Sequence, residues 1–321
     1  MSATAERQAR ALLRLGNLPH IWCPGCSNGI VLRAVARAIL QAGLDRDKTV
    51  IVSGIGCSSR ATGYLDFDTV HTTHGRPLAF ATGIKLANPE LNVIVLAGDG
   101  DTAAIGGNHF IHAARRNVGL ALVCFNNNIY GMTGGQHSPT THLGDRATSA
   151  PYGHLEPAFD LCRLAEAAGA TYVARGTAYH FQPLVRYLTT AFRHRGFAFV
   201  EVVSTCPVYY GRQNRLGGAP EMLQWIAERS VTVREAEKLP PAELAGKIVV
   251  GEFRRVEAPE YSAAYLDLVR RVQAEAATRG REGAGRFARE GAGQRPAVPA
   301  LAGGRERVEV RLAGAGGQGQ V

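Results

Sequence analysis

The chain has 321 residues, of which 45% are hydrophobic and 20% are charged, and its formal net charge is +9. This composition excludes a wholly disordered or fibrous protein, because that share of apolar residues can fill a buried core. No apolar run approaches the roughly 20 residues of a membrane-spanning helix, and the polar N-terminus lacks the apolar stretch of a signal peptide. We therefore expect a soluble, cytoplasmic protein with no membrane partner.

The predicted elements alternate between helices and strands. Short, continuous apolar runs predict strands over 49–53, 93–97, 120–125 and 198–203. Apolar residues at helical spacing predict helices over 30–41, 105–116, 159–168, 183–194, 221–238 and 260–278. Strands that are apolar throughout and alternate with helices predict an α/β fold, in which an open, mostly parallel sheet carries helices on both faces.

The composition changes near the C-terminus. Residues 280–306 are rich in Gly, Ala, Arg and Pro and lack an apolar period, which predicts a flexible linker over 271–306. Residues 307–321 alternate like a strand and then enter a glycine-rich turn. On composition alone, a disordered tail is favoured there over the start of a second domain. We thus expect an N-terminal extension over 1–19 and one main domain over 20–270.

Much of the positive charge lies in the same C-terminal stretch. Residues 270–311 contain ten Arg and five Glu, so they contribute +5 of the +9. A basic stretch of this kind is one feature of nucleic-acid-binding proteins, but the interleaved Glu residues weaken that interpretation. We expect no nucleic-acid partner.

Polar residues follow two of the predicted strands. Gly98, Asp99 and Gly100 end the strand over 93–97, and Asn127 follows the strand over 120–125. In an open parallel sheet, ligands bind beyond the carboxyl ends of the strands. A carboxylate and an amide oxygen suit Mg²⁺, and the glycines let the backbone approach a diphosphate closely. The Gly98–Asp99–Gly100 triplet and Asn127 together therefore predict a binding site for a diphosphate group with Mg²⁺.

This spacing resembles the motif of enzymes that use thiamine diphosphate. The resemblance implies that Asp99 and Asn127 are magnesium ligands and that the backbone carbonyl of Ile129 is a third ligand. The residues that follow should line the cofactor pocket, namely Tyr130, Gly131, Met132 and Thr133. The fold implied is the diphosphate-binding type of thiamine-diphosphate domain.

Four of the six cysteines lie where they can converge. Cys23 and Cys26 form a C-x-x-C motif, and Cys57 and Cys206 each follow a predicted strand. Four thiolates at one sheet edge can hold either a 4Fe–4S cluster or a structural zinc ion. The other two, Cys124 and Cys162, lie in apolar patterns and are expected to be small buried side chains.

Several segments together carry a more specific resemblance. They are IWCPGCSNG, SGIGCSS, HTTHGRPLAFATGIKLANP, GDGDTAAIGGNHFIHAARRN and FNNNIYGMTGGQ. They resemble the β subunits of the 2-oxoacid:ferredoxin oxidoreductases, most closely the 2-oxoglutarate type. The resemblance implies thiamine-dependent oxidative decarboxylation of a 2-oxoacid with coenzyme A, which yields acyl-CoA and CO₂ and reduces ferredoxin. It also implies one 4Fe–4S cluster, bound by Cys23, Cys26, Cys57 and Cys206.

The same resemblance bears on partners and on the C-terminus. In the family, an α subunit carries the domain that binds the pyrimidine ring of thiamine, so this chain is expected to act only with such a subunit. The sequence RVEVRLAGAGGQG resembles the start of the family's γ subunit or domain. This likeness outweighs the composition, which favoured a disordered tail, and it predicts the truncated start of a γ-like domain over 307–321.

A 2-oxoglutarate pocket needs a group that pairs with the distal carboxylate of the substrate. Arg60 is the first candidate and His74 the second, with His71 and Arg76 as further choices. A pyruvate-type or broad-specificity member of the same family is an alternative. A non-redox thiamine-dependent decarboxylase or synthase is another, since it shares Asp99 and Asn127 but does not need the cysteines.

Overall fold

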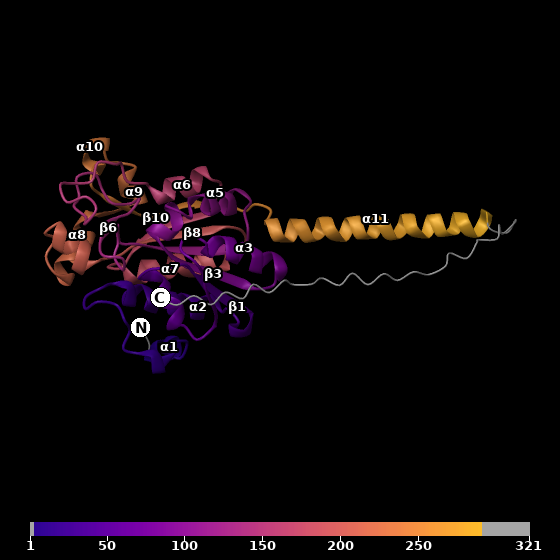
Figure 1. Ribbon diagram of the computed structural model, residues 1–321, viewed down its shortest axis with the longest axis horizontal. Helices are drawn as coiled ribbons and strands as arrows, with labels where there is room; N and C mark the ends of the chain where they lie inside the picture. The colour runs from indigo at the N-terminus through magenta and orange to yellow at the C-terminus, as the bar shows by residue number, and fades with distance from the viewer. Residues whose placement is uncertain (1–2, 291–321) are drawn as a thin grey trace, which may run out of the picture. The chain divides into compact units, whose positions relative to one another are not determined.

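The computed structural model describes residues 3–290 and centres on a β-sheet (Figure 1). Its strands are β1 Thr49–Ser53, β2 Asp68–His71, β3 Asn92–Gly98, β4 Leu120–Asn126, β7 Tyr172–Thr177, β8 Ala198–Val203, β9 Ser230–Thr232 and β10 Ile248–Arg255. In the described residues these form one sheet in the order β2-β1-β3-β4-β8-β7-β10-β9. All neighbours are parallel except β10 and β7, which confirms the predicted open, mostly parallel sheet.

Helices cover both faces of this sheet. The helices of the described residues are α1 Ala3–Arg10, α2 Asn28–Ala42, α3 Pro77–Ala87, α4 Asp99–Ala103, α5 Gly107–Arg115, α6 Leu161–Ala167, α7 Phe181–Arg193, α8 Ala219–Arg229, α9 Val233–Ala236, α10 Pro241–Leu244 and α11 Tyr261–Glu290. The core has one part beneath α2 and α7 and another beneath α3, α5 and α6, on opposite sides of the strands (Figure 1). In the part of the chain that is described, no helix is long and apolar enough to cross a membrane.

The alternation of β4 shows how the sheet divides the core. Ala121, Val123 and Phe125 pack in the part beneath α2 and α7, whereas Leu120, Leu122 and Cys124 pack in the other. Successive side chains of a strand point to opposite faces, so a strand that is covered on both faces is apolar throughout. This explains why β4 carries no polar residue before Asn126.

One predicted helix agrees with the structure and another differs. The helix expected over 105–116 is observed as α5, from Gly107 to Arg115, and the separate short helix α4 precedes it. The one expected over 221–238 is interrupted by β9, whose residues pair in parallel with β10. That pairing joins residues about twenty positions apart along the chain, and no helical period can reveal it.

The C-terminal helix extends further than the sequence pattern predicted. The chain divides into two units, the first ending at Leu268, and α11 continues to Glu290. The first twenty residues of the predicted linker over 271–306 are therefore helical, because Ala, Glu and Arg favour a helix enough to outweigh the scattered glycines. The rest of that linker and the γ-like stretch over 307–321 lie outside the described residues.

The topology brings several loops to one edge of the sheet. Strands β1, β3, β4 and β8 are mutually parallel, so the segments after Ser53, Gly98, Asn126 and Val203 all begin at the same edge. These segments carry Asp99, Asn127, Cys57 and Cys206, which are the predicted metal ligands outside the C-x-x-C motif and the Ile129 carbonyl. That motif immediately precedes α2.

Candidate functional site

A cavity of about 530 Å³ opens at the carboxyl ends of β1, β3 and β4. All of the residues predicted to bind the cofactor line it, namely Gly98, Asp99, Gly100, Asn127, Ile129, Tyr130, Gly131, Met132 and Thr133. His74 lines it as well. The structure thus brings together, around one space, residues that the sequence places on two separate strand ends.

Asp99 lies at the floor of this cavity and is 4% exposed. The hydroxyls of Ser138 and Thr140 both donate to its Oδ2, at 2.6 Å each. Burial raises the pKa of the Asp99 carboxyl to about 6, although these hydrogen bonds act to lower it. The backbone N–H groups of Gly100 and of Asp99 itself also donate to this carboxylate. These donors fix its position on the cavity wall, where a carboxylate suits a metal ion such as Mg²⁺.

Gly100 allows an aromatic ring to close over the turn after β3. A Cβ at this position would lie 2.1 Å from Tyr130 Cε1, which is far inside van der Waals contact. Burial, and then the nearby carboxylate of Asp99, raises the pKa of Tyr130 to about 12. The phenol thus remains neutral at physiological pH and lines the cavity as a hydrogen-bonding group.

The asparagine run after β4 forms a tight turn. Asn128 has a φ of 61°, in the left-handed region that asparagine tolerates better than most residues. The Oδ1 atom of Asn127 accepts a hydrogen bond from the Ile129 N–H at 3.3 Å. The short strands β5 Ile129–Tyr130 and β6 Gln136–His137 then pair, and the chain returns to place Thr140 beside Asp99. The turn thus fixes Asn127 and Ile129, two of the three predicted magnesium ligands, relative to each other.

Asp101 joins three of the loops at this edge. Its carboxylate accepts hydrogen bonds from the backbone of Ile55 at 3.1 Å and of Gly75 at 2.7 Å, and from the hydroxyl of Ser59 at 3.3 Å. His74 Nδ1 lies 2.9 Å from Asp101 Oδ1. The ring of His74 is thereby oriented, and its side chain lines the cavity.

The four predicted cysteines line a second cavity, of about 200 Å³. Cys23 and Cys26 reach it from the loop before α2, Cys57 from the loop after β1, and Cys206 from the loop after β8. A Cβ at Gly131 would lie 3.5 Å from Cys57 Sγ and 3.6 Å from Cys206 Sγ, so a side chain at this position would contact both sulfurs. The residues present therefore fit a sulfur-ligated metal centre.

Burial disfavours the charged form of three of these thiols. It raises the pKa of Cys26 to about 12 and that of Cys57 to about 11, and it also raises the pKa of Cys206. Thiols with raised pKa values lose their protons when a metal supplies positive charge.

The remaining candidates occupy the rim or lie outside it. Arg60 is exposed and does not line either cavity, but its guanidinium Nη2 lies 4.0 Å from Sδ of Met132, which lines both. His71 and Arg76 line neither cavity, and Arg76 donates to the carbonyls of Gly75 and Ile105. Cys124 and Cys162 are fully buried, as predicted.

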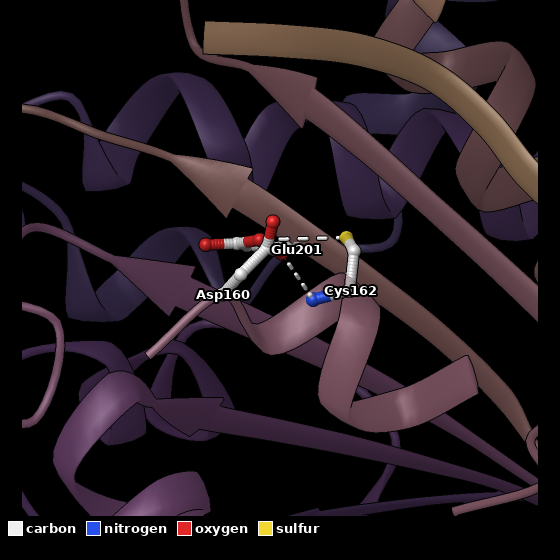
Figure 2. Close-up of side chains that lie close together, drawn as sticks. All are labelled: Asp160, Cys162 and Glu201. Atoms are coloured by element: carbon white, nitrogen blue, oxygen red, sulfur yellow. Dashed lines mark hydrogen bonds between the residues drawn. The ribbon is translucent and has the colours of Figure 1, made fainter. Parts of the chain in front are cut away.

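A different group of potential metal ligands lies beneath the sheet edge. Figure 2 shows Asp160, Cys162 and Glu201 close together. Their potential ligand atoms all lie within 4.8 Å of one another. Arg175, however, donates to Glu201 at 2.7 Å and to Asp160 at 2.6 Å. Because the guanidinium already neutralises these carboxylates, the geometry indicates an ion-pair network rather than a metal site.

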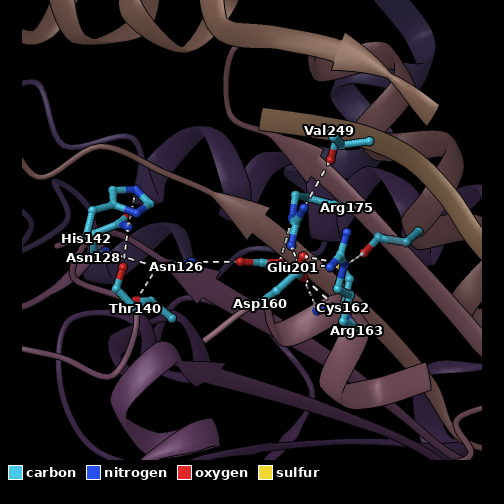
Figure 3. A network of polar contacts seen from close by, with 11 residues as sticks. Asn126, Asn128, Thr140, His142, Asp160, Cys162, Arg163, Arg175, Glu201 and Val249 are labelled. Atoms are coloured by element: carbon cyan, nitrogen blue, oxygen red, sulfur yellow. Dashed lines mark hydrogen bonds and ion pairs between the residues drawn. The ribbon is translucent and has the colours of Figure 1, made fainter. Parts of the chain in front are cut away.

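This network extends to the asparagine turn (Figure 3). Glu201 Oε1 accepts a hydrogen bond from Asn126 Nδ2 at 2.7 Å, and Asn126 Oδ1 accepts one from Thr140 at 2.8 Å. Thr140 Oγ1 also lies 2.6 Å from Asp99 Oδ2, and its single proton can serve only one of these two acceptors at a time. Close polar contacts therefore link the Arg175–Glu201 ion pair to the predicted magnesium ligand.

Sequence reasoning missed several of these supporting residues. Ser138, Thr140, Asp101 and Glu201 carry no recognisable spacing, since each acts through a contact between distant segments. Asp101 could have been noticed, because it places a second carboxylate two residues after Asp99, directly after the Gly-Asp-Gly motif. The hydroxyl-rich sequence over 138–141 was a weaker one.

The fold and this cavity define a cofactor-binding α/β domain of the kind found in thiamine-dependent enzymes. Residues 54–202 match the family "Thiamine pyrophosphate enzyme, C-terminal TPP binding domain". The 2-oxoglutarate synthase subunit KorB of Methanocaldococcus jannaschii is 53% identical over 263 residues, which cover 82% of this chain and 97% of that protein. The KorB subunit of Archaeoglobus fulgidus is 61% identical over 197 residues, 61% of this chain and 73% of that protein.

A solved structure gives the same answer. The 2-oxoglutarate:ferredoxin oxidoreductase of Magnetococcus marinus, determined with 2-oxoglutarate, coenzyme A and succinyl-CoA bound, superposes with a TM-score of 0.75 and 32% identity. The match covers 83% of this chain and 91% of that one. The chain therefore belongs to the β subunits of the 2-oxoacid:ferredoxin oxidoreductases, of the 2-oxoglutarate synthase type. The resemblance drawn from the sequence motifs is confirmed.

Proposed function

We propose that this subunit binds the diphosphate end of thiamine diphosphate through Mg²⁺ and holds one 4Fe–4S cluster beside it. The whole enzyme would convert a 2-oxoacid, chiefly 2-oxoglutarate, and coenzyme A to acyl-CoA and CO₂, and would pass two electrons to ferredoxin. The observation that carries the proposal is a wall shared by two cavities. Cys57, Asn127, Gly131 and Met132 line both the 530 Å³ cavity and the cysteine cavity.

The chain's own residues would divide the work as follows. Asp99, Asn127 and the Ile129 carbonyl would hold Mg²⁺, which suits oxygen ligands of this kind. Tyr130 and Met132 would pack beside the cofactor, and the Nδ1 contact to Asp101 would present the other ring nitrogen of His74 to the substrate. When bound, thiamine diphosphate supplies the carbon nucleophile that attacks the 2-oxoacid and accepts the electron pair left after CO₂ departs.

The spacing of the cysteines favours an iron–sulfur cluster over zinc. Among the described residues, no three of the four cysteine sulfurs lie within 4.8 Å of one another. Tetrahedral zinc, with Zn–S bonds of about 2.3 Å, would need sulfurs about 3.8 Å apart. A cluster binds each thiolate to a different iron and so accommodates wider spacing.

The first test is the metal content and the redox activity. The complex of this chain with its α subunit, purified without oxygen, should contain about four irons per β subunit and reduce ferredoxin with 2-oxoglutarate and coenzyme A. The chain alone should give no turnover. Cys206→Ala should lose most of the iron and the ferredoxin activity, whereas Cys124→Ala, which changes a buried cysteine of β4, should keep both.

Zinc in place of iron, or thiamine-dependent decarboxylation without ferredoxin reduction, would contradict the redox assignment. Either result would instead support the non-redox thiamine enzyme considered from the sequence. If the enzyme contains iron but prefers pyruvate, only the proposed substrate would be wrong, and the redox assignment would stand.

The second test concerns the distal carboxylate of the substrate. Arg60 is the cationic side chain that contacts Met132 at the rim of the cavity. Arg60→Ala should raise the KM for 2-oxoglutarate about 10-fold, the cost of one charge-assisted hydrogen bond, and leave the KM for pyruvate nearly unchanged. Arg186→Ala is the control, because that exposed arginine lies on α7 and its guanidinium stacks on Tyr187. Equal effects on both substrates would remove Arg60 from this role.

A further inference from the structure

The side-chain amide of Asn28 is buried and forms no hydrogen bond within the described residues. Its side chain is only 1% exposed, yet neither Oδ1 nor Nδ2 has a hydrogen-bond partner. Among the described residues it is the one side chain with two such atoms. A buried amide without partners destabilises the folded protein, so its presence requires an explanation.

The position of Asn28 supplies that explanation. It is the first residue of the 15-residue helix α2, and it lines the 530 Å³ cavity together with Asp99 and Asn127. Its backbone N–H donates to the Cys26 sulfur, and the hydroxyl of the preceding Ser27 accepts a hydrogen bond from Thr205 N–H at 2.7 Å. The backbone is thus fixed by contacts of its own, while the side chain is left to face the cavity.

We infer that the Asn28 amide binds the diphosphate of thiamine diphosphate, with Nδ2 donating to a phosphate oxygen. The inference rests on the proposed function. Two independent features favour an anionic group at this place. The amide donor is unpartnered in the protein itself, and the positive end of the α2 helix dipole lies at the same residue. The oxygen, Oδ1, can accept from a water that Mg²⁺ retains.

The test compares Asn28→Leu with the wild type in the complex with the α subunit. Leucine has a similar size but no polar atoms. The variant should bind thiamine diphosphate with Mg²⁺ about 10- to 100-fold more weakly, as expected for loss of a hydrogen bond to a charged group. Inorganic diphosphate with Mg²⁺, measured by competition, should weaken by the same factor. The iron content should not change.

A stability measurement separates ligand binding from a structural role. Without cofactor, Asn28→Leu should unfold at the same temperature as the wild type or higher, because it removes two unsatisfied buried atoms. Thr205→Val is the matched control, since the Thr205 hydroxyl is also buried and unpartnered but lines neither cavity. It should retain the wild-type affinity for thiamine diphosphate.

The outcomes are distinct. Unchanged affinity in Asn28→Leu, or a loss for thiamine diphosphate without one for inorganic diphosphate, would overturn the inference. If Asn28→Leu does not fold, Asn28→Asp decides, because its added negative charge should repel both diphosphates and equal affinity would refute the contact. If the wild type binds no thiamine diphosphate, the proposed function itself fails.

Discussion

Asp99→Asn should weaken the Mg²⁺-dependent binding of thiamine diphosphate by about 100-fold or more. Changes to residues that only support metal ligands typically cost 10- to 100-fold in metal affinity, so loss of the sole carboxylate of the proposed ligand set should cost at least as much. The two hydroxyls on Oδ2 hold this carboxylate in place. Isothermal titration with thiamine diphosphate at fixed Mg²⁺ measures the effect.

Ser138→Ala provides a graded comparison. It removes one of the two hydroxyls and keeps the carboxylate, so it should cost about 10-fold. Wild-type affinity in Asp99→Asn would show that the metal binds elsewhere and would remove the central element of the proposed site.

The same carboxylate predicts a pH dependence of binding. Burial raises the pKa of Asp99 to about 6 in the protein without metal. Mg²⁺ binds the deprotonated form, so protons compete with the metal as the pH falls through this value. The affinity for Mg²⁺ and thiamine diphosphate should therefore decrease between pH 7 and pH 5. In Asp99→Asn the dependence should largely disappear.

Arg175→Met should lower the free energy of unfolding by about 3–5 kcal/mol, the usual cost of leaving one partner of a buried ion pair alone. Glu201 is 3% exposed, and Arg175 forms its one ion pair in the described part of the chain. The variant would keep much of the side-chain volume but leave the Glu201 carboxylate buried without a counter-charge. Denaturant titration of the metal-free chain gives the measurement.

Arg163→Met is the matched control for this change. Arg163 also pairs with Asp160, at 3.5 Å, but its side chain is 85% exposed. An exposed pair of this kind contributes about 0.2–1 kcal/mol, so Arg163→Met should change the free energy of unfolding very little. The double variant Arg175→Met with Glu201→Gln should recover part of the loss, because the uncompensated charge is gone. Equal effects of the two single arginine changes would refute the argument.

The sequence predicted best those elements whose formation depends on a short, continuous stretch of residues. The strands over 49–53 and 198–203 were predicted with their observed bounds, because both are buried along almost their whole length and are rich in β-branched and other apolar residues. Strands β7 and β10 were not predicted. Their partners include each other in an antiparallel pair, and the residues in register are more than seventy positions apart.

The candidate site divides in the same way. The residues proposed to line the cofactor occur in two continuous segments at strand ends, so their spacing indicates them. Asn28 and Thr140 have no such pattern, because their proposed roles depend on which loops meet in three dimensions. The interrupted helix over 221–238 has a similar origin, since β9 exists only through its pairing with β10.

The wall common to the two cavities also limits how the enzyme can evolve. Because Cys57, Asn127, Gly131 and Met132 line both cavities, a substitution there would alter the surroundings of both proposed cofactors at once. A change that improves one function would therefore also affect the other, so these positions have little freedom. Arg60 lines neither cavity, but its positive charge acts to lower the pKa of Cys57, so a substitution at this position would also change the electrostatics of the proposed cluster site.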